Sequence, residues 1–441
     1  MDQLQEHALL IIRTAVEAVK PRRLLSLAVR LDKDTLVIGE DRFDLSRVGR
    51  ILVVGAGKAS AHMAEALEEI VGQRIADGVV IVKDGYAVPS SRIRVFEAGH
   101  PILDQRTVEA SKQLIGLVQS AGDQDLVIGL WSGGGSTLLE SIPQGLSLKD
   151  LQATSAALLK SGMSIQEANV VRRHLSLVKG GQLLRFIAPA KSVNLVLSDV
   201  VGDPLECVSS GPTATDPSTF ADAREVIRRH ELEALIPASV RSYLEDGRKG
   251  NWPETLKPGD LLLRNVANLV VGNNRIALKA AERKARELGY GTMIVTETLQ
   301  GESREVARAV ASIVKEVQRN DIPVAKPACI LLGGETTVSV RGDGMGGRNQ
   351  ELVLAALIEM EGEEGEFLVA SCGTDGTDGM TDAAGGWVTS RTLREASALG
   401  LDAIRFLDRN DSYHFLDKVE GLIRMGPTGT NVMDLVLALI P

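Results

Sequence analysis

The feature that most constrains this chain is a repeated order of apolar strand, glycine-rich turn and helix. The apolar run 51–54 leads into Gly55-Ala56-Gly57-Lys58 and a helical stretch at 61–71. A further strand expected at 125–130 leads into Ser132-Gly133-Gly134-Gly135 and a second helical stretch. Strands that alternate with helices in this way are typical of a doubly wound parallel sheet. Ligands of such sheets bind at the carboxyl ends of strands, where both glycine turns fall.

A second series of strands and helices follows residue 260, with apolar strands expected at 268–272, 292–296, 329–332 and 367–371. The stretch 245–259 before it is polar and rich in Gly, Pro and charge, which is typical of a linker. A chain of 441 residues also exceeds one typical core. We therefore expect two domains, a Rossmann-like α/β domain at 1–250 and a C-terminal α/β domain at 260–441.

The composition excludes several classes of protein. The formal net charge of −9 and the aromatic content of 3% argue against a nucleic-acid surface. The chain has no run of roughly 20 apolar residues and no signal sequence at its start, so we expect a cytoplasmic protein that does not enter a membrane. Cys207, Cys329 and Cys372 are widely spaced, which favours reduced thiols over disulfides or a zinc site.

The two N-terminal glycine turns carry groups suited to an anion. Lys58 follows a strand, where it can neutralise a phosphate as a point charge. The glycines at 133–135 and the hydroxyls of Ser136 and Thr137 form a nest of N–H donors before a helix. An exposed lysine at a helix start and a tight structural turn are the plain alternatives. The stretch 55–60 completes neither a Walker A motif nor GxGxxG, so a P-loop is excluded and a dinucleotide site is disfavoured.

The stretch 333–357 of the second domain also combines glycines with a cation and a helix start. Four glycines between 342 and 347 precede Arg348 at the mouth of an apolar helix. We expect the glycines to bring the backbone close to a ligand, and the helix start to offer free N–H groups to an anion. Arg348 would add a planar fork that matches phosphate or carboxylate. The alternative is a long β-hairpin loop followed by a capped helix.

Carboxylates follow two further strands. Asp199 follows the buried strand expected at 192–197, and the glycine loop 373–379 holds Asp375 and Asp378. Carboxylates placed in this way hold Mg²⁺ or accept a hydroxyl proton, although loop capping explains them too. Residues 169–174 add basic groups; Arg172 or His174 could reach a ligand, while a solvated helix face explains the pair Arg172 and Arg173 equally well. The residue types together indicate a phosphotransferase or another phosphate-handling enzyme.

Several stretches together resemble one family. They are VVGAGKAS (53–60), WSGGGSTLL (131–139), NVVRRHLSLVKGGQL (169–183), LSDVVGDPLECVSSGPTATDPST (197–219), GGETTVSVRGDGMGGRNQELVLAAL (333–357), GTDGTDGMTDAAG (373–385) and GPTGTNVMDL (426–435). In these stretches the chain resembles the class II glycerate kinases, glycerate 2-kinases whose C-terminal part is called the MOFRL domain. The resemblance covers nearly the whole chain in order, and it places the MOFRL region at about residues 328–437.

The resemblance implies a reaction and a set of site residues. The γ-phosphoryl group of ATP would move to the 2-hydroxyl of D-glycerate, giving 2-phosphoglycerate and ADP, with Mg²⁺ or a similar cation. The active site would lie in the interdomain cleft of a monomer or homodimer. Lys58 and Arg348 would stabilise the migrating phosphoryl group; of Asp199 and Asp375, one would act on the hydroxyl and the other hold metal, with Asp378 a further metal candidate. The expected substrate-binding and ATP-binding residues are Gly57, Ser132, Gly133, Gly134, Gly135, Ser136, Asn273, Asn274, Glu335, Gly347 and Asn349.

Two other functions remain open at this point. Members of this family have been labelled hydroxypyruvate reductases, which would make the protein an NAD(P)H-dependent oxidoreductase. The incomplete GxGxxG at 55–60 argues against that reading. The other alternative is a non-catalytic sensor of small acids that uses the same residues.

Overall fold

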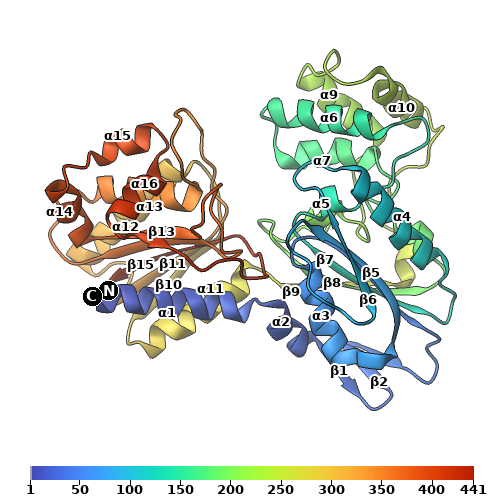
Figure 1. The fold of residues 1–441 in the computed structure, drawn as a ribbon, viewed down its shortest axis with the longest axis horizontal. Helices are drawn as coiled ribbons and strands as arrows, with labels where there is room; N and C mark the ends of the chain where they lie inside the picture. Colours follow the sequence, from blue (N-terminus) through green and yellow to red (C-terminus); the bar gives the residue numbers. More distant parts are fainter. Residues whose placement is uncertain (1) are drawn as a thin grey trace. The chain divides into compact units, whose positions relative to one another are not determined.

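The computed structural model describes residues 2–441, which divide into two compact units (Figure 1). The Lys58 unit comprises Leu24–Ser198 and Asp203–Val271, and the Arg348 unit comprises the segment up to Arg23, Asp199–Gly202 and Gly272–Pro441. This division differs from the expected boundaries of 1–250 and 260–441 at both ends. The N-terminal helix packs with the C-terminal unit, and residues 251–271 stay with the N-terminal one.

The sheet of the Lys58 unit confirms the predicted doubly wound parallel architecture. Its strand order is β6-β5-β4-β7-β8-β9, and the four pairs from β6 to β8 are parallel. The order reverses between β4 and β7, which makes their carboxyl ends the topological switch point. The central strands are continuous apolar runs because helices cover both faces. The strands are β4 (Ile51–Ala56), β5 (Ile75–Lys83), β6 (Ile93–Ala98), β7 (Leu126–Ser132), β8 (Lys191–Leu197) and β9 (Val266–Gly272).

A helical cluster with its own apolar core completes the Lys58 unit. It contains α6 (Leu148–Lys160), α7 (Ile165–His174), α9 (Phe220–Arg229) and α10 (Ala238–Arg248), seen together in Figure 1. Capping boxes at Ser147, Ser164 and Thr219 fix where α6, α7 and α9 begin. The unit also holds α3 (Ser60–Val71), α4 (Gln105–Gln119), α5 (Gly135–Leu138), α8 (Leu184–Ile187), short 3₁₀ turns at Gly72–Arg74, Val208–Ser210 and Leu261–Asn265, and most of α2 (Pro21–Ala28).

One local prediction in this unit needs correction. The expected linker at 245–259 is part of the packed unit, because the Leu256 N–H donates to Gly180 O at 2.8 Å and the Leu256 carbonyl accepts from Asp216 N at 2.8 Å. Leu256 is fully buried. Residues 22–49, which precede the strand expected at 51–54, form most of α2 and an antiparallel meander of β1 (Val29–Asp32), β2 (Thr35–Ile38) and β3 (Asp41–Asp44).

The Arg348 unit is built on a mixed sheet of order β10-β11-β15-β12-β13-β14. The last long strand, β15, runs antiparallel between β11 and β12, and its first residue, Asp434, pairs with both Gly334 and Gly373. One carboxylate therefore starts a strand where two neighbouring strands end. The strands are β10 (Gly291–Leu299), β11 (Ala328–Gly334), β12 (Leu368–Gly373), β13 (Gly385–Thr389), β14 (Leu422–Ile423) and β15 (Asp434–Ile440).

Helices cover both faces of this second sheet. On one face α1 (Gln3–Ala18) lies along α11 (Asn274–Glu287), and on the other α12 (Ser303–Asn320) packs against α13 (Arg348–Glu359) (Figure 1). Nearly all of α13 is buried, because the outer helices enclose it over the sheet. Those outer helices include α15 (Ala403–Asp408) and α16 (Ser412–Lys418), while α14 (Ser390–Ala398) packs against β13.

No helix among residues 2–441 is both long and apolar enough to cross a lipid bilayer. Cys207, Cys329 and Cys372 are free cysteines in the structure.

Candidate active site

The two glycine turns of the Lys58 unit interlock at the switch point between β4 and β7. Lys58 N donates to Gly133 O at 2.8 Å, and Ala59 N donates to Ser132 Oγ at 3.0 Å. Gly57 has a φ of 137°, and a Cβ at this position would lie 2.2 Å from Ser132 Oγ. Only glycine fits there. The backbone of both turns is thereby fixed, and it carries Lys58 at the carboxyl edge of the sheet.

Substitution of Gly57 tests this interlock. We expect Gly57→Ala to lower the free energy of unfolding by about 2–4 kcal/mol, because it adds a clash to an unfavourable φ. Gly116 on α4 is the matched control, since a Cβ there meets no atom within 4 Å. Gly116→Ala should raise stability by about 0.5–1 kcal/mol through helix propensity. Urea unfolding checks both values, and equal stability of the two variants would contradict the interlock.

The residues of the second turn have unequal access to a ligand. Ser132 is fully buried, and its hydroxyl lies 3.2 Å from that of Ser60, so the side chain serves turn packing and leaves only its backbone for an anion. Gly135 faces Ser209, which donates to Ser132 O at 2.8 Å. Ser136 is partly exposed and accepts a hydrogen bond from Ser210 Oγ at 2.8 Å. The partly exposed Gly134 and Ser136 are the members of the turn best placed for a ligand.

His100 lies beside this turn. A Cβ built on Gly134 would be 3.0 Å from His100 Nε2 and 3.3 Å from Lys58 Cγ. Burial, with smaller effects from Lys58 and Lys83, lowers the pKa of His100 to about 4. The imidazole is therefore neutral at pH 7 and adds no positive charge beside Lys58.

The pKa of His100 reports on the position of Lys58. Because Lys58 disfavours the imidazolium, Lys58→Met should raise the pKa of His100 above about 4. The new value should stay below the ordinary value of about 6.5, since burial is the larger cause. NMR titration of the His100 ring protons measures the change, with the exposed Lys112→Met as the control. An unchanged pKa in Lys58→Met would place Lys58 away from His100.

In the Arg348 unit, the start of α13 is closed to an anion by an internal carboxylate. Asp378 accepts from Asn349 N at 3.2 Å and from Gln350 N at 2.9 Å, and a Cβ on Gly347 would lie 2.3 Å from its Cγ. Burial raises the pKa of Asp378 to about 6. The expectation of free N–H groups at this helix start is therefore wrong. The Asp378 carboxylate occupies them, and this use also makes Asp378 a poor metal ligand.

The glycine loop before Arg348 also differs from the expectation. Its glycines let the loop pack against residues 409–412, since a Cβ on Gly342 would lie 2.3 Å from Arg409 O and one on Gly346 would lie 2.2 Å from Ser412 Oγ. The run 337–340 forms no hairpin, and only an isolated bridge joins Thr337 to Glu302. These glycines are explained by close packing within the unit.

Arg348 itself is held by two carboxylates. Its Nε and Nη2 donate to the two oxygens of Asp434 at 2.6 and 2.9 Å, and its Nη1 lies 2.7 Å from Glu335 Oε1. Burial works against the charge, but Asp434 and Glu335 raise the pKa of Arg348 further above its ordinary value. The Asp434 side chain is 5% exposed and the Arg348 side chain is 33% exposed. The guanidinium is therefore fixed by a buried partner and keeps an accessible edge.

The remaining predicted acids gather near the carboxyl end of β12. A Cβ on Gly373 would lie 3.2 Å from Asp375 Oδ1 and 3.6 Å from Asp434 Oδ1. Asp199 accepts from Asn431 Nδ2 at 3.2 Å, and Asp375 O accepts from Thr428 N of the same loop at 3.2 Å. The structure thus brings Arg348, Asp375 and Asp434 to one sheet edge. Sequence reasoning missed Asp434, although a lone carboxylate at the head of an apolar strand was a signal for it.

Three predicted binding residues of this unit are engaged inside the protein. Asn273 caps α11 by accepting from Ile276 N at 3.2 Å. Asn274 is buried and donates to Val432 O at 2.8 Å and to Asp434 O at 2.9 Å. Asn349 is buried and accepts from Ser371 Oγ at 2.5 Å. The side chains of Asn274 and Asn349 therefore support β15 and the helix start, and the expected ligand contact through them does not fit their burial.

The described carboxylates of the Arg348 unit do not form a complete metal site by themselves. Residues 2–441 contain no group of three or more His, Cys, Asp and Glu side chains placed to hold a metal ion. Mg²⁺ in phosphotransferases is held by one or two carboxylates together with substrate phosphates, so a larger protein cluster is not required. Asp199 and Asp375 fit that donor chemistry, and Asp378 does not.

Family models, curated relatives and solved structures match this chain. The model of a domain of unknown function, DUF4147, matches residues 7–245, and the model of the MOFRL family matches residues 328–434. The glycerate 2-kinase of Pyrococcus horikoshii is 40% identical over 99% of this chain and 97% of its own. A putative hydroxypyruvate reductase of Agrobacterium vitis is 41% identical over 89% of this chain and 87% of its own. The crystal structure of a glycerate kinase from Thermotoga maritima, 41% identical, superposes with a TM-score of 0.87 over 99% of both chains.

The doubly wound sheet and the second α/β unit define an α/β protein, and the whole-length similarity to glycerate kinases makes it an enzyme of the kinase class. The chain belongs to the MOFRL family, and its relatives include glycerate 2-kinases that match it along its whole length.

Proposed function

We propose that this protein is an ATP-dependent kinase that transfers the γ-phosphoryl group to the 2-hydroxyl of D-glycerate, giving 2-phosphoglycerate and ADP. The main observation behind this proposal is the position of Lys58, whose backbone the two interlocked turns fix at the switch point. Phosphoryl transfer needs positioning and charge stabilisation more than covalent chemistry, and a fixed lysine and arginine supply both. The whole-length similarity to glycerate 2-kinases supports the choice of acceptor.

The residues take the following roles in this proposal. Lys58 and Arg348 stabilise negative charge on the migrating phosphoryl group. The 2-hydroxyl oxygen forms the new P–O bond, the bond from the γ-phosphorus to the bridging oxygen breaks, and ADP keeps that electron pair. The hydroxyl proton passes to a carboxylate. Asp199 and Asp375 are the two carboxylates for the remaining tasks, proton acceptance and holding Mg²⁺, which when bound neutralises phosphate oxygens.

The alternative function is that of a hydroxypyruvate reductase, and one hydrogen bond in the first turn argues against it. The third glycine of GxGxxG allows close packing of helix and strand in dinucleotide sites. Ser60 stands in its place here, and its buried hydroxyl donates to Leu130 O at 2.9 Å. The turn is therefore built around a serine side chain. The proposal also includes a cytoplasmic location, which the three free thiols support, and a monomeric or homodimeric state.

A direct assay separates these functions. The protein is incubated with D-glycerate, ATP and Mg²⁺, and ADP is quantified by chromatography; a parallel reaction follows NADH or NADPH with hydroxypyruvate. We expect ADP in proportion to the D-glycerate consumed and no oxidation of the reduced cofactor. Cofactor oxidation without ADP would establish the reductase. Inactivity in both reactions, together with binding of D-glycerate, would favour a sensor of small acids.

A further inference from the structure

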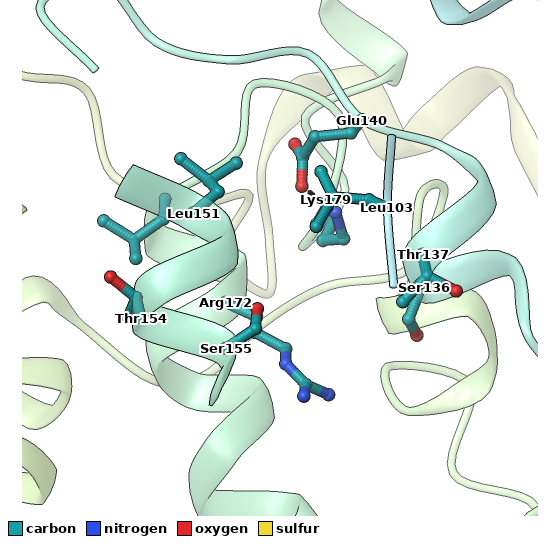
Figure 2. A pocket seen from close by; sticks show the side chains of 10 residues that line it. Leu103, Ser136, Thr137, Glu140, Leu151, Thr154, Ser155, Arg172 and Lys179 are labelled. Atoms are coloured by element: carbon teal, nitrogen blue, oxygen red, sulfur yellow. Dashed lines mark hydrogen bonds and ion pairs between the residues drawn. The ribbon is translucent and has the colours of Figure 1, made fainter. Parts of the chain in front are cut away.

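A small pocket in the Lys58 unit lies beside the triple-glycine turn. It is bounded by the turn residues Ser136 and Thr137, by α6, and by Arg172 of α7 (Figure 2). Figure 2 shows the guanidinium of Arg172 in the space between α6, which carries Thr154 and Ser155, and the turn. The pocket encloses about 20 Å³, room for little more than one water-sized group, so it could take the end of an anion but not a nucleoside.

One of the two cations that line this pocket is already neutralised. Lys179 is 1% exposed, forms a close ion pair with Glu140, and donates to Leu139 O at 3.1 Å. Glu140 is itself buried and accepts from Ser141 N at 3.0 Å. This pair closes one side of the pocket without adding net charge.

Arg172 differs from both of its neighbours in the chain. Arg173 donates to Glu206 O at 3.1 Å and lies 3.3 Å from Asp216 Oδ2, and His174 lies 3.1 Å from Glu254 Oε2. The Arg172 side chain has no ion pair or hydrogen bond with any residue between 2 and 441, although it is half-buried. Burial lowers its pKa from the ordinary value. A desolvated cation without a partner is costly, so the site favours an anion that would complete it.

We propose that Arg172 binds the carboxylate of the acceptor substrate, an α-hydroxy acid, in this pocket. The inference rests on the proposed kinase function and adds the group that recognises the acid. The planar guanidinium matches a carboxylate through two parallel hydrogen bonds. The partly exposed Ser136 hydroxyl accepts from Ser210 Oγ and keeps its own proton to donate, whereas Thr137 Oγ1 already donates to Gly134 O at 3.2 Å. Leu103, Leu151 and Leu175 line the rest of the pocket. Ser136 directly follows the glycine turn, and Gly134 of that turn lies beside Lys58. An acid bound at Ser136 would therefore lie on the same turn as Lys58.

The experiment compares Arg172→Met and Arg172→Lys with wild-type protein, using D-glycerate, its uncharged amide glyceramide, and ATP. We expect Arg172→Met to raise KM for D-glycerate by about 100-fold and to leave KM for ATP within about twofold. Preference for D-glycerate over glyceramide should fall by a similar factor. Arg172→Lys should restore part of the affinity, because it keeps the charge without the fork. Calorimetric titration with D-glycerate alone gives the same comparison without turnover.

Each outcome has a defined meaning. The control is Arg248→Met, on an exposed arginine paired with Glu245 on α10, and it should change neither KM. An unchanged KM for D-glycerate in folded Arg172→Met, or in Arg172→Lys if the first variant does not fold, overturns the inference. A raised KM for ATP instead would assign the pocket to a nucleotide phosphate and also overturns it. Wild-type protein that forms no ADP contradicts the proposed function itself, which separates the two failures.

Discussion

Arg348→Ala should lower kcat for ADP formation from D-glycerate and ATP by about 10³-fold or more. An arginine that stabilises the transferring phosphoryl group contributes on the order of 10³–10⁵ to turnover. The bidentate pair with Asp434 holds the guanidinium in place before substrate arrives, so this stabilisation requires no reorganisation. Steady-state kinetics at saturating substrates measures the loss. A folded Arg348→Ala protein with near-wild-type kcat would remove Arg348 from the reaction.

Stability has to be controlled in this experiment. Loss of Arg348 leaves the charge of buried Asp434 unpaired, which costs about 3–5 kcal/mol. The double variant Arg348→Ala/Asp434→Asn removes both charges, and we expect it to regain much of the stability while turnover stays low. Arg319→Ala, which breaks an exposed pair with Glu363 in the same unit, is the matched control and should leave kcat unchanged. Recovery of turnover in the double variant would show that Arg348 acts only on the fold.

Lys58→Met should lower kcat by about 10²–10³-fold, the effect of removing one preorganised charge-stabilising donor. The backbone N–H of Lys58, which bonds to Gly133 O, holds the turn, so methionine should preserve the interlock. KM for D-glycerate should change less than kcat, because the charge acts mainly in the transition state. Lys112→Met, on the exposed surface of α4, is the control. Equal kcat values for the two variants would contradict the role of Lys58.

The sheet of the Lys58 unit was predictable because its signals are local. Each apolar run and the glycine turn that follows it are contiguous in the chain, and two strand–turn–helix units define a parallel sheet. The placement of α1 was not predictable in this way. Its apolar stripe packs against α11, more than 250 residues later, and nothing in residues 3–18 indicates which distant surface will cover it. Residues 251–271 likewise pack with the Lys58 unit through contacts distant in sequence, such as that of Leu256 N with Gly180 O.

The candidate site also contains residues that local motifs predict and residues whose contacts are distant in sequence. Lys58 and the turn at 133–135 were found from contiguous motifs, and the structure places them together. The partner of Arg348 is Asp434, which lies 86 residues away, and the cap of α13 is Asp378, 29 residues from Asn349. A helix start preceded by glycines favours an anion, but the sequence does not reveal that the protein supplies that anion itself. The role of Arg172 was ambiguous for a related reason. The sequence does not show that Arg173 and His174 have partners inside the protein while Arg172 lines a pocket.

The position of the phosphoryl group in the product tests the central claim most directly. D-glycerate labelled with carbon-13 at C2 is converted with ATP and Mg²⁺, and the product is examined by phosphorus NMR. We predict a single phosphomonoester whose phosphorus couples to the labelled carbon as in 2-phosphoglycerate, formed in equal amount to ADP. A phosphomonoester on C3, or no phosphorylated product while hydroxypyruvate is reduced with NADH or NADPH, would contradict a glycerate 2-kinase.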